Sequence, residues 1–261
     1  MRYVYMVSAI AMLLILPDQN IFAQSSRKSS KILDAACIYK PNTSFLFKAV
    51  YDSCGIVQTE EYILMRILPE ILAGEILILY DYYKNIPKIV DGDSIVNVED
   101  KIWMRSEETI LYDHKKGVQL HPPRAGKYYL SQYFPFPNIK LPIKAGKKSK
   151  WALTYHPDTY KFLWHKYEMR NSPKFQYQYK DSLIEVYEKK GTATSYIGEY
   201  TASYLFNEEF GFVKWHLLTS NNVSLEFTLI DIYPVLLKNN VQTDNYTSVL
   251  KSYKRNSKTK K

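Results

Sequence analysis

The sequence contains none of the short motifs that mark common catalytic or nucleotide-binding sites. It has no Gly-x-Ser-x-Gly, no His-Glu-x-x-His and no glycine-rich phosphate or dinucleotide loop. Its 5 histidines include no pair at the close spacing of a local zinc motif. These absences exclude the enzymes that carry such signatures. We therefore predict no catalytic, cofactor-binding or metal-binding residue from the sequence.

Long apolar runs are also missing after the N-terminus. Arg2 precedes an apolar run, Tyr3–Leu16, that is interrupted by one serine. This run is shorter than the roughly 20 residues that a membrane-spanning helix needs. Ile21 and Ala23 occupy the third and first positions before a cleavage site after Ala23. We expect residues 1–23 to be a cleaved signal peptide and the mature chain to be periplasmic or secreted; an uncleaved anchor is the alternative.

The chain has only 2 cysteines, Cys37 and Cys54. Disulfides persist in the oxidising compartments that an exported chain reaches. We therefore predict a bridge between the two, worth about 3 kcal/mol for a loop of this size. Two free thiols are the alternative. A lipid attached to Cys37 is a further alternative, although charged residues separate Cys37 from the apolar run.

Acidic residues are absent from the last eleven positions, which hold six of the basic ones. The formal net charge is +9, and without these six side chains it is +3. We predict that residues 251–261 form a disordered basic tail that contacts anionic lipopolysaccharide or phospholipid, or that only keeps the chain soluble. Nucleic acid is not an expected partner of an exported protein. The basic residues are Lys251, Lys254, Arg255, Lys258, Lys260 and Lys261.

Short alternating runs rich in Tyr, Phe, Ile and Val recur along the chain, and no strong amphipathic helix is present. This pattern predicts a mainly β fold, with antiparallel curved sheets forming an open barrel or a sandwich. Predicted strands include Glu75–Tyr83, Tyr128–Phe134 and a strand that ends at Leu68, before a turn through Pro69 to Gly74. A short helix over Glu60–Ala73, with Thr59 as its N-cap, is the alternative for this last segment. Lys189-Lys190-Gly191 is predicted to be a hairpin turn.

A proline-rich stretch, residues 133–143, separates two groups of predicted strands. Pro135, Pro137 and Pro142 forbid a central strand and favour extended backbone. We predict an N-terminal β region over residues 24–132, a C-terminal β region over residues 133–250 and the tail. A crossing loop inside one domain is the alternative.

The segment YLFNEEFGFVKWHLL, Tyr204–Leu218, predicts a hairpin with an Asn-Glu-Glu turn, in which Gly211 adopts a positive φ. Trp215 and its aliphatic neighbours are predicted to be core. Four aromatic residues near the hairpin tip either fill the core or line a groove for a ligand. These candidate ligand-lining residues are Tyr204, Phe206, Phe210 and Phe212.

Two segments resemble a family of exported β-rich proteins of Bacteroidota with no established activity. The first is the proline-rich stretch from Phe134 to Gly146 followed by Trp151, and the second is the hairpin sequence from Tyr204 to Val213. The resemblance covers residues 133–233 and implies a periplasmic or secreted curved antiparallel sheet. It implies no activity.

These observations predict an exported, non-catalytic β protein. We expect it to bind an envelope component, an apolar ligand or a protein partner through the concave face of its sheet. One alternative is an envelope hydrolase acting on glycan or lipid, which requires His156, His165 or a carboxylate in a concave pocket beside another polar group. The other alternative is a scaffold subunit of a surface or secretion assembly.

Overall fold

The structure is a computed structural model. It describes residues 38–53, 56–72, 75–91, 96–98, 102–114, 117–154, 164–195, 198–234 and 238–239. The predicted signal peptide, both cysteines and the basic tail lie outside these residues, so the signal peptide, the disulfide and the tail stay predictions.

The described residues form strands and one 3-10 helix, η2. The first elements are β1 (Ser44–Ser53), β2 (Ile56–Leu72), β3 (Glu75–Tyr83), β4 (Ile89–Asp91), β5 (Val96–Val98), β6 (Met104–His114), β7 (Gly117–Leu120), η2 (Gly126–Tyr133) and β8 (Asn138–Lys140). The remaining elements are β9 (Lys148–Thr154), β10 (Trp164–Tyr179), β11 (Ser182–Ser195), β12 (Gly198–Asn207), β13 (Gly211–Thr219), β14 (Val223–Tyr233) and β15 (Lys238–Asn239).

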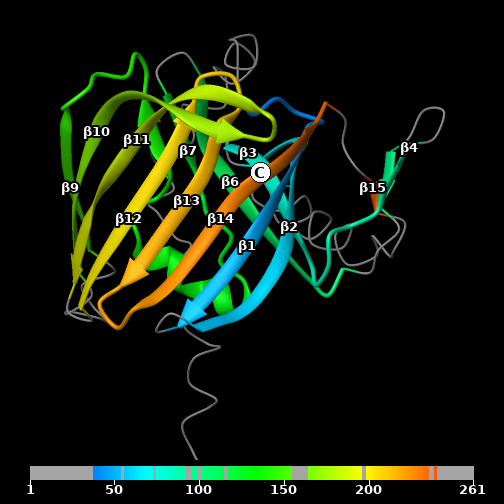
Figure 1. Cartoon of the computed structure of the whole chain (residues 1–261), viewed down its shortest axis with the longest axis horizontal. Coiled ribbons are helices and arrows are strands. Elements are labelled where there is room, and N and C mark those ends of the chain that lie inside the picture. The colour runs from blue at the N-terminus through cyan, green and yellow to red at the C-terminus, as the bar shows by residue number, and fades with distance from the viewer. Residues whose placement is uncertain are drawn as a thin grey trace, which may run out of the picture.

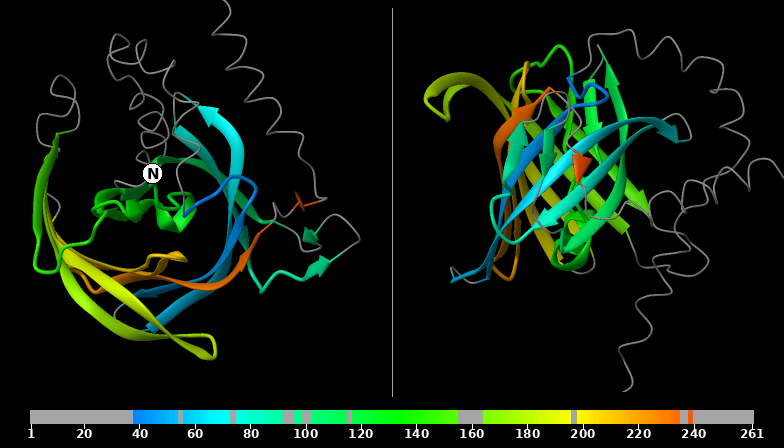
Figure 2. Two further views of the ribbon diagram at one scale, coloured as in Figure 1. Left: turned by 90° about the horizontal axis from the view of Figure 1, so that it is seen from above. Right: turned by 90° about the vertical axis from the view of Figure 1, so that its right-hand side faces the viewer.

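One antiparallel sheet of 12 strands makes up most of the fold, in the order β8-β7-β6-β3-β2-β1-β14-β13-β12-β11-β10-β9. The sheet curves strongly around a central space (Figures 1 and 2). The early strand β1 pairs with the late strand β14, so both predicted β regions contribute to this sheet. In the strand order, β8 and β9 are the two edges and do not pair with each other. We call the space between these edges the seam.

The predicted fold class is confirmed, as are strand β3 and the hairpin over Asn207–Gly211, in which Gly211 has φ +77°. Two of the predicted strands are wrong. The strand predicted to end at Leu68 continues as β2 to Leu72 through an irregularity between Ile67 and Ile71, because a shift in register accommodates Pro69.

The strand predicted over Tyr128–Phe134 is instead η2. Its fully buried Tyr128 and Ser131 are three positions apart, which is the period of a 3-10 helix. η2 lies within the curve of the sheet (Figure 2, left). The Tyr128 ring stacks on Tyr82 of β3 at 5.5 Å and contacts Phe227 of β14 at 5.6 Å. The Tyr128 hydroxyl donates to Glu61 at 2.8 Å. This part of the concave face is therefore covered by the chain itself.

The core lies on the concave side of the sheet. Alternate residues of each strand point inward, as a pleated sheet requires, and large aromatic rings fill the space between them. Trp215 of β13 is 1% exposed and packs against Phe47 at 5.4 Å and Phe227 at 5.3 Å. The sequence prediction that Trp215 belongs to the core is confirmed.

The convex side of β2 and β3 is also buried and contains a cluster of charges. Asp81 of β3 is 0% exposed. A guanidinium nitrogen of Arg66 on β2 lies 2.5 Å from one carboxylate oxygen of Asp81. Arg105 of β6, which lies opposite Asp81 in the sheet, donates to the other carboxylate oxygen. One buried carboxylate thus holds two guanidinium groups and links three strands.

The hairpin β10–β11 extends beyond its neighbours and bends over the convex face (Figure 1). Its tip contacts β14: the Tyr179 hydroxyl donates to the Ile230 carbonyl at 3.4 Å, and Lys180 pairs with Asp231 at 2.7 Å. A groove of about 390 Å³ lies beneath the hairpin. Its charges are compensated, because Lys214 pairs with Glu226 at 2.9 Å.

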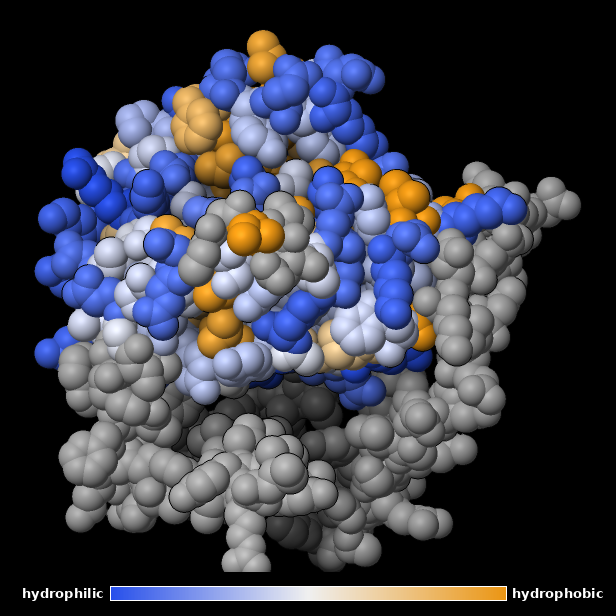
Figure 3. Space-filling model, turned by 60° about the horizontal axis from the view of Figure 1, so that its bottom comes forward, coloured by the Kyte–Doolittle hydropathy of each residue, from blue (hydrophilic) through white to orange (hydrophobic). Residues whose placement is uncertain are grey.

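The described surface is largely hydrophilic on the side shown in Figure 3, and hydrophobic residues are scattered over it. Large hydrophobic side chains that are exposed come from separate segments of the chain: Ile56, Ile86, Trp103, Tyr129, Phe175 and Leu183. Within the described residues, no helix has the length and hydropathy of a membrane span.

Candidate functional site

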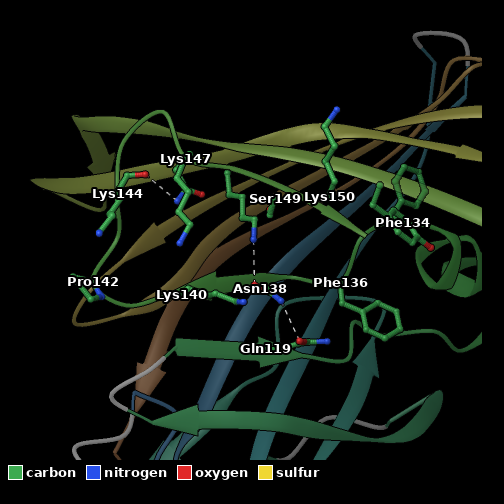
Figure 4. Close-up of a pocket in the computed structure, with 13 residues that line it drawn as sticks. Gln119, Phe134, Phe136, Asn138, Lys140, Pro142, Lys144, Lys147, Ser149 and Lys150 are labelled. Atoms are coloured by element: carbon green, nitrogen blue, oxygen red, sulfur yellow. Dashed lines mark hydrogen bonds between the residues drawn. The ribbon is translucent and has the colours of Figure 1, made fainter. Parts of the chain in front are cut away.

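A cavity of about 450 Å³ lies at the seam, between the β7–β8 edge and the inner face of β9–β11 (Figure 4). The segment from Pro142 to Lys147 connects the two edge strands and forms part of the wall. The lining therefore comes from segments that are distant in the sequence. We call this space the seam cavity.

Five of the residues that line the seam cavity are lysines, and none is acidic. Lys150 is partly neutralised, because Glu168 lies 2.7 Å away on the neighbouring strand. Among the described residues, no carboxylate lies within ion-pair distance of Lys140, Lys144 or Lys147. The cavity thus carries excess positive charge. Its lysines are Lys140, Lys144, Lys147, Lys150 and Lys189.

Lys189 is the buried member of this group, with 6% of its surface exposed. It lies on the inner face of β11, opposite Asn171 of β10 and Tyr204 of β12. Its ammonium group crosses the seam and donates to Asn138 Oδ1 at 3.1 Å. Burial, and then the positive charge of Lys140, lower the pKa of Lys189 from 10.5 to about 8.

Asn171 fixes the connecting segment against β10. Its carbonyl accepts from the Gly146 amide at 2.8 Å, and its own amide donates to the Lys147 carbonyl at 3.2 Å. Its side-chain Nδ2 donates to the Lys144 carbonyl at 3.3 Å. Gly146 has φ +73°, a conformation that glycine adopts without strain. Lys144 and Lys147 are consequently carried on a constrained turn at the cavity.

The aromatic wall of the cavity comes from the proline-rich stretch. Buried Phe134 packs edge-on against Tyr200 at 5.1 Å, and half-buried Phe136 lies 4.9 Å from the His121 ring. Pro135 lies between these two residues in the sequence, and its carbonyl accepts a hydrogen bond from the Tyr204 hydroxyl. Because both groups are buried, this hydrogen bond holds the stretch on the inner face of β12.

Replacing Tyr204 by phenylalanine is expected to lower the free energy of unfolding by about 1–3 kcal/mol, because the Pro135 carbonyl loses a buried donor. Urea unfolding at equilibrium measures this change. Tyr187→Phe on β11 is the matched control, since the Tyr187 hydroxyl has no hydrogen-bond partner among the described residues. Equal losses in the two variants would contradict the anchoring role of Tyr204.

The four aromatic residues predicted at the hairpin tip lie apart from the seam lining. Tyr204, Phe206 and Phe212 are at most 1% exposed, and the Phe206 and Phe212 rings meet at 5.1 Å. Half-buried Phe210 packs against Tyr179 of the bent hairpin at 5.3 Å. Tyr204 contributes to the site indirectly, through the hydrogen bond from its hydroxyl to the Pro135 carbonyl.

Lys189 was not predicted to be a site residue, because the sequence Lys189-Lys190-Gly191 predicts a hairpin turn. This turn prediction is wrong. β11 continues through these residues. Gly191 is there because β10 approaches closely: a Cβ at this position would lie 1.8 Å from the Glu168 carbonyl oxygen. The available signal was the alternation of Lys189, Gly191 and Ala193, which places all three on one face of a strand.

His165, one of the two histidines named in the hydrolase alternative, does not line the seam cavity. His165 is 0% exposed on β10, stacked between Tyr133 at 5.8 Å and Tyr167 at 6.1 Å. Burial lowers its pKa. His156 lies outside the described residues. The chemistry that the seam cavity offers is the donation of hydrogen bonds and positive charge.

No protein-family model matches the chain, and no curated protein matches it. The chain is similar to several solved structures, including the following three. One is a candidate exported protein with a YmcC-like fold from Bacteroides fragilis, at 7% identity and a TM-score of 0.43, covering 76% of this chain and 100% of that one. Another is a candidate lipoprotein from Parabacteroides distasonis, at 10% identity and a TM-score of 0.35, covering 77% and 100%.

The third is the hypothetical lipoprotein YmcC from Escherichia coli, at 10% identity and a TM-score of 0.32, covering 83% of this chain and 98% of that one. At these TM-scores, the likenesses are too weak to assign the chain to a family or to transfer a function to it.

Proposed function

We propose that this chain is an exported, non-catalytic binding protein whose seam cavity holds a negatively charged group of an envelope component. Export is supported by the N-terminal sequence. Binding is supported by the cavity, in which five lysines and no carboxylate line about 450 Å³. A volume of this size is typical of ligand sites, and polar groups that converge in it fix a ligand's orientation.

The observation that carries the proposal is the position of Lys189. Lys189 is 6% exposed as a whole residue, and a charged side chain buried to this extent is tolerated where partners or a ligand replace its hydration. Asn138 supplies one acceptor at 3.1 Å. An anion in the cavity would supply a further acceptor. Neighbouring lysines at the cavity wall would donate to the same anion.

Replacing Lys189 by methionine is expected to weaken retention on lipopolysaccharide by about tenfold or more, because a hydrogen bond to a charged group contributes roughly 1.5–3 kcal/mol. Lys190→Met is the matched control. It removes the same charge from the next residue of β11, whose exposed side chain lines the convex groove instead. Equal retention of both variants would overturn the assignment of the cavity as the binding site.

The proposed basic tail is tested in the same assay by removing residues 251–261. If the tail contacts the envelope electrostatically, its removal should lower retention at low salt and have little effect at high salt. The difference between Lys189→Met and Lys190→Met should persist without the tail, because a buried ammonium group is screened less than an exposed one.

Affinity for an anion of constant charge, such as sulfate, is expected to fall as pH rises above about 8, where unliganded Lys189 loses its proton. Above this pH, binding must take up a proton, so the affinity decreases by up to tenfold per pH unit. Other titratable groups that line the cavity are Lys140, Lys144, Lys147, Lys150 and Tyr167, and Lys150 points away from it. The comparison is therefore with Lys189→Met, whose affinity should be flat between pH 7 and about 9. Parallel curves for both proteins would contradict the role of Lys189.

A further inference from the structure

The lining of the seam cavity contains more than positive charge. Three amide side chains, Gln119, Asn138 and Asn171, line it together with the lysines. Asn138 uses both ends of its amide: Oδ1 accepts from Lys189 and Nδ2 donates to Gln119 Oε1 at 3.0 Å. An amide offers both donors and acceptors, whereas an ammonium group only donates. Amides therefore match hydroxyl groups, which also donate and accept.

Aromatic rings line the same space. Phe134 and Tyr167 are buried, and Phe136 is half-buried at the cavity wall (Figure 4). Rings of this kind provide flat apolar contact area beside the polar groups. A small inorganic anion has no apolar surface to place against these rings. A ring-shaped ligand with an apolar face and hydroxyl groups at its edge uses both the aromatic rings and the amides.

From this combination we infer that the ligand of the seam cavity is a glycan whose sugar residue bears an anionic substituent, with the sugar ring against Phe136 and the anionic group toward Lys189. This inference rests on the proposed function, and names the ligand class for the same site. A carboxylate and a phosphate ester both place negative charge beside the lysines, so the shared chemistry is an acidic sugar. Phospholipid headgroups are the competing source of anionic charge.

The test measures binding to the mature protein by isothermal titration calorimetry with five probes. The probes are a short oligomer of galacturonic acid, a neutral galactose oligomer of equal length, galactose 1-phosphate, sulfate, and vesicles containing phosphatidylglycerol. We expect the acidic sugars to bind at least tenfold more tightly than both the neutral oligomer and sulfate. The oligomer and the sugar phosphate together show whether a carboxylate or a phosphate is preferred.

Two variants separate the contributions of charge and ring. Lys189→Met should weaken binding of acidic sugars and sulfate alike by tenfold or more. Phe136→Leu keeps apolar volume but removes the ring, so it should weaken acidic-sugar binding roughly two- to tenfold and leave sulfate binding unchanged. Phe175→Leu, at an exposed position of the bent hairpin, is the matched control.

The outcomes are distinguishable. If sulfate binds as tightly as the acidic sugars, or if Phe136→Leu weakens both equally, the cavity is an anion site and the glycan inference is wrong. Tighter binding to the vesicles, lost in Lys189→Met, would replace the glycan by a lipid headgroup. If no anionic probe binds, or if Lys189→Met binds all of them normally, the proposed function itself fails.

Discussion

Asp81→Asn is expected to lower the free energy of unfolding by about 3–5 kcal/mol. Asp81 is fully buried on the convex side of β3, and it is the shared partner of Arg66 and Arg105. Removing its charge leaves the buried guanidinium of Arg66 and the largely buried one of Arg105 without their shared carboxylate, and breaking a buried ion pair from one side has a cost of this size. The measurement is urea unfolding followed by circular dichroism.

Glu60→Gln is the control for this prediction. Glu60 pairs with Lys48 at 2.7 Å, but their side chains are 43% and 40% exposed. Water and salt screen such a pair, so its loss should change stability only slightly. A loss in Asp81→Asn as small as that in Glu60→Gln would show that water reaches the Asp81 cluster.

Trp215→Ala is expected to cost about 3–5 kcal/mol by a different mechanism, because it removes a large ring from the concave core and leaves a cavity. Trp215 is 1% exposed and touches Phe47, Phe212 and Phe227. These rings belong to β1, β13 and β14, which join the start and end of the chain. Loss of Trp215 should therefore destabilise the whole sheet.

The matched control is Trp103→Ala, since Trp103 is 39% exposed. We expect less than half the loss seen for Trp215→Ala, because less apolar area returns to water. Urea denaturation of both variants gives the comparison. A similar loss in both would contradict the central position of Trp215 in the core.

Local sequence patterns were sufficient to predict the fold class and the hairpin around Asn207–Gly211. Alternation of apolar and polar residues reports which face of a strand is buried, and Gly211 marked a position with positive φ. They were not sufficient for Lys189-Lys190-Gly191. A Lys-Lys-Gly sequence suits an exposed turn equally well, and only the neighbouring strand β10 shows why glycine is required within β11.

The seam cavity was not predictable for the same physical reason. Gln119, Asn138 and Lys189 meet because a sheet of 12 strands curves until its edges approach each other. That curvature results from the pairing of all the strands together, and no short segment of the sequence predicts it. The proline-rich stretch was predicted to be extended and irregular, but its role as an aromatic wall depends on the distant Tyr204 hydroxyl.

The separation of β8 from β9 also bears on how specificity can change. Elsewhere in the sheet, the spacing of neighbouring strands is fixed by backbone ladders that any sequence change must respect. Across the gap there is no such ladder, and the hydrogen bond from Lys189 to Asn138 is a side-chain link between the two sides. Substitutions at these positions can widen or narrow the seam without disturbing a backbone ladder. Related chains can therefore differ in the ligand that they bind while keeping the same architecture.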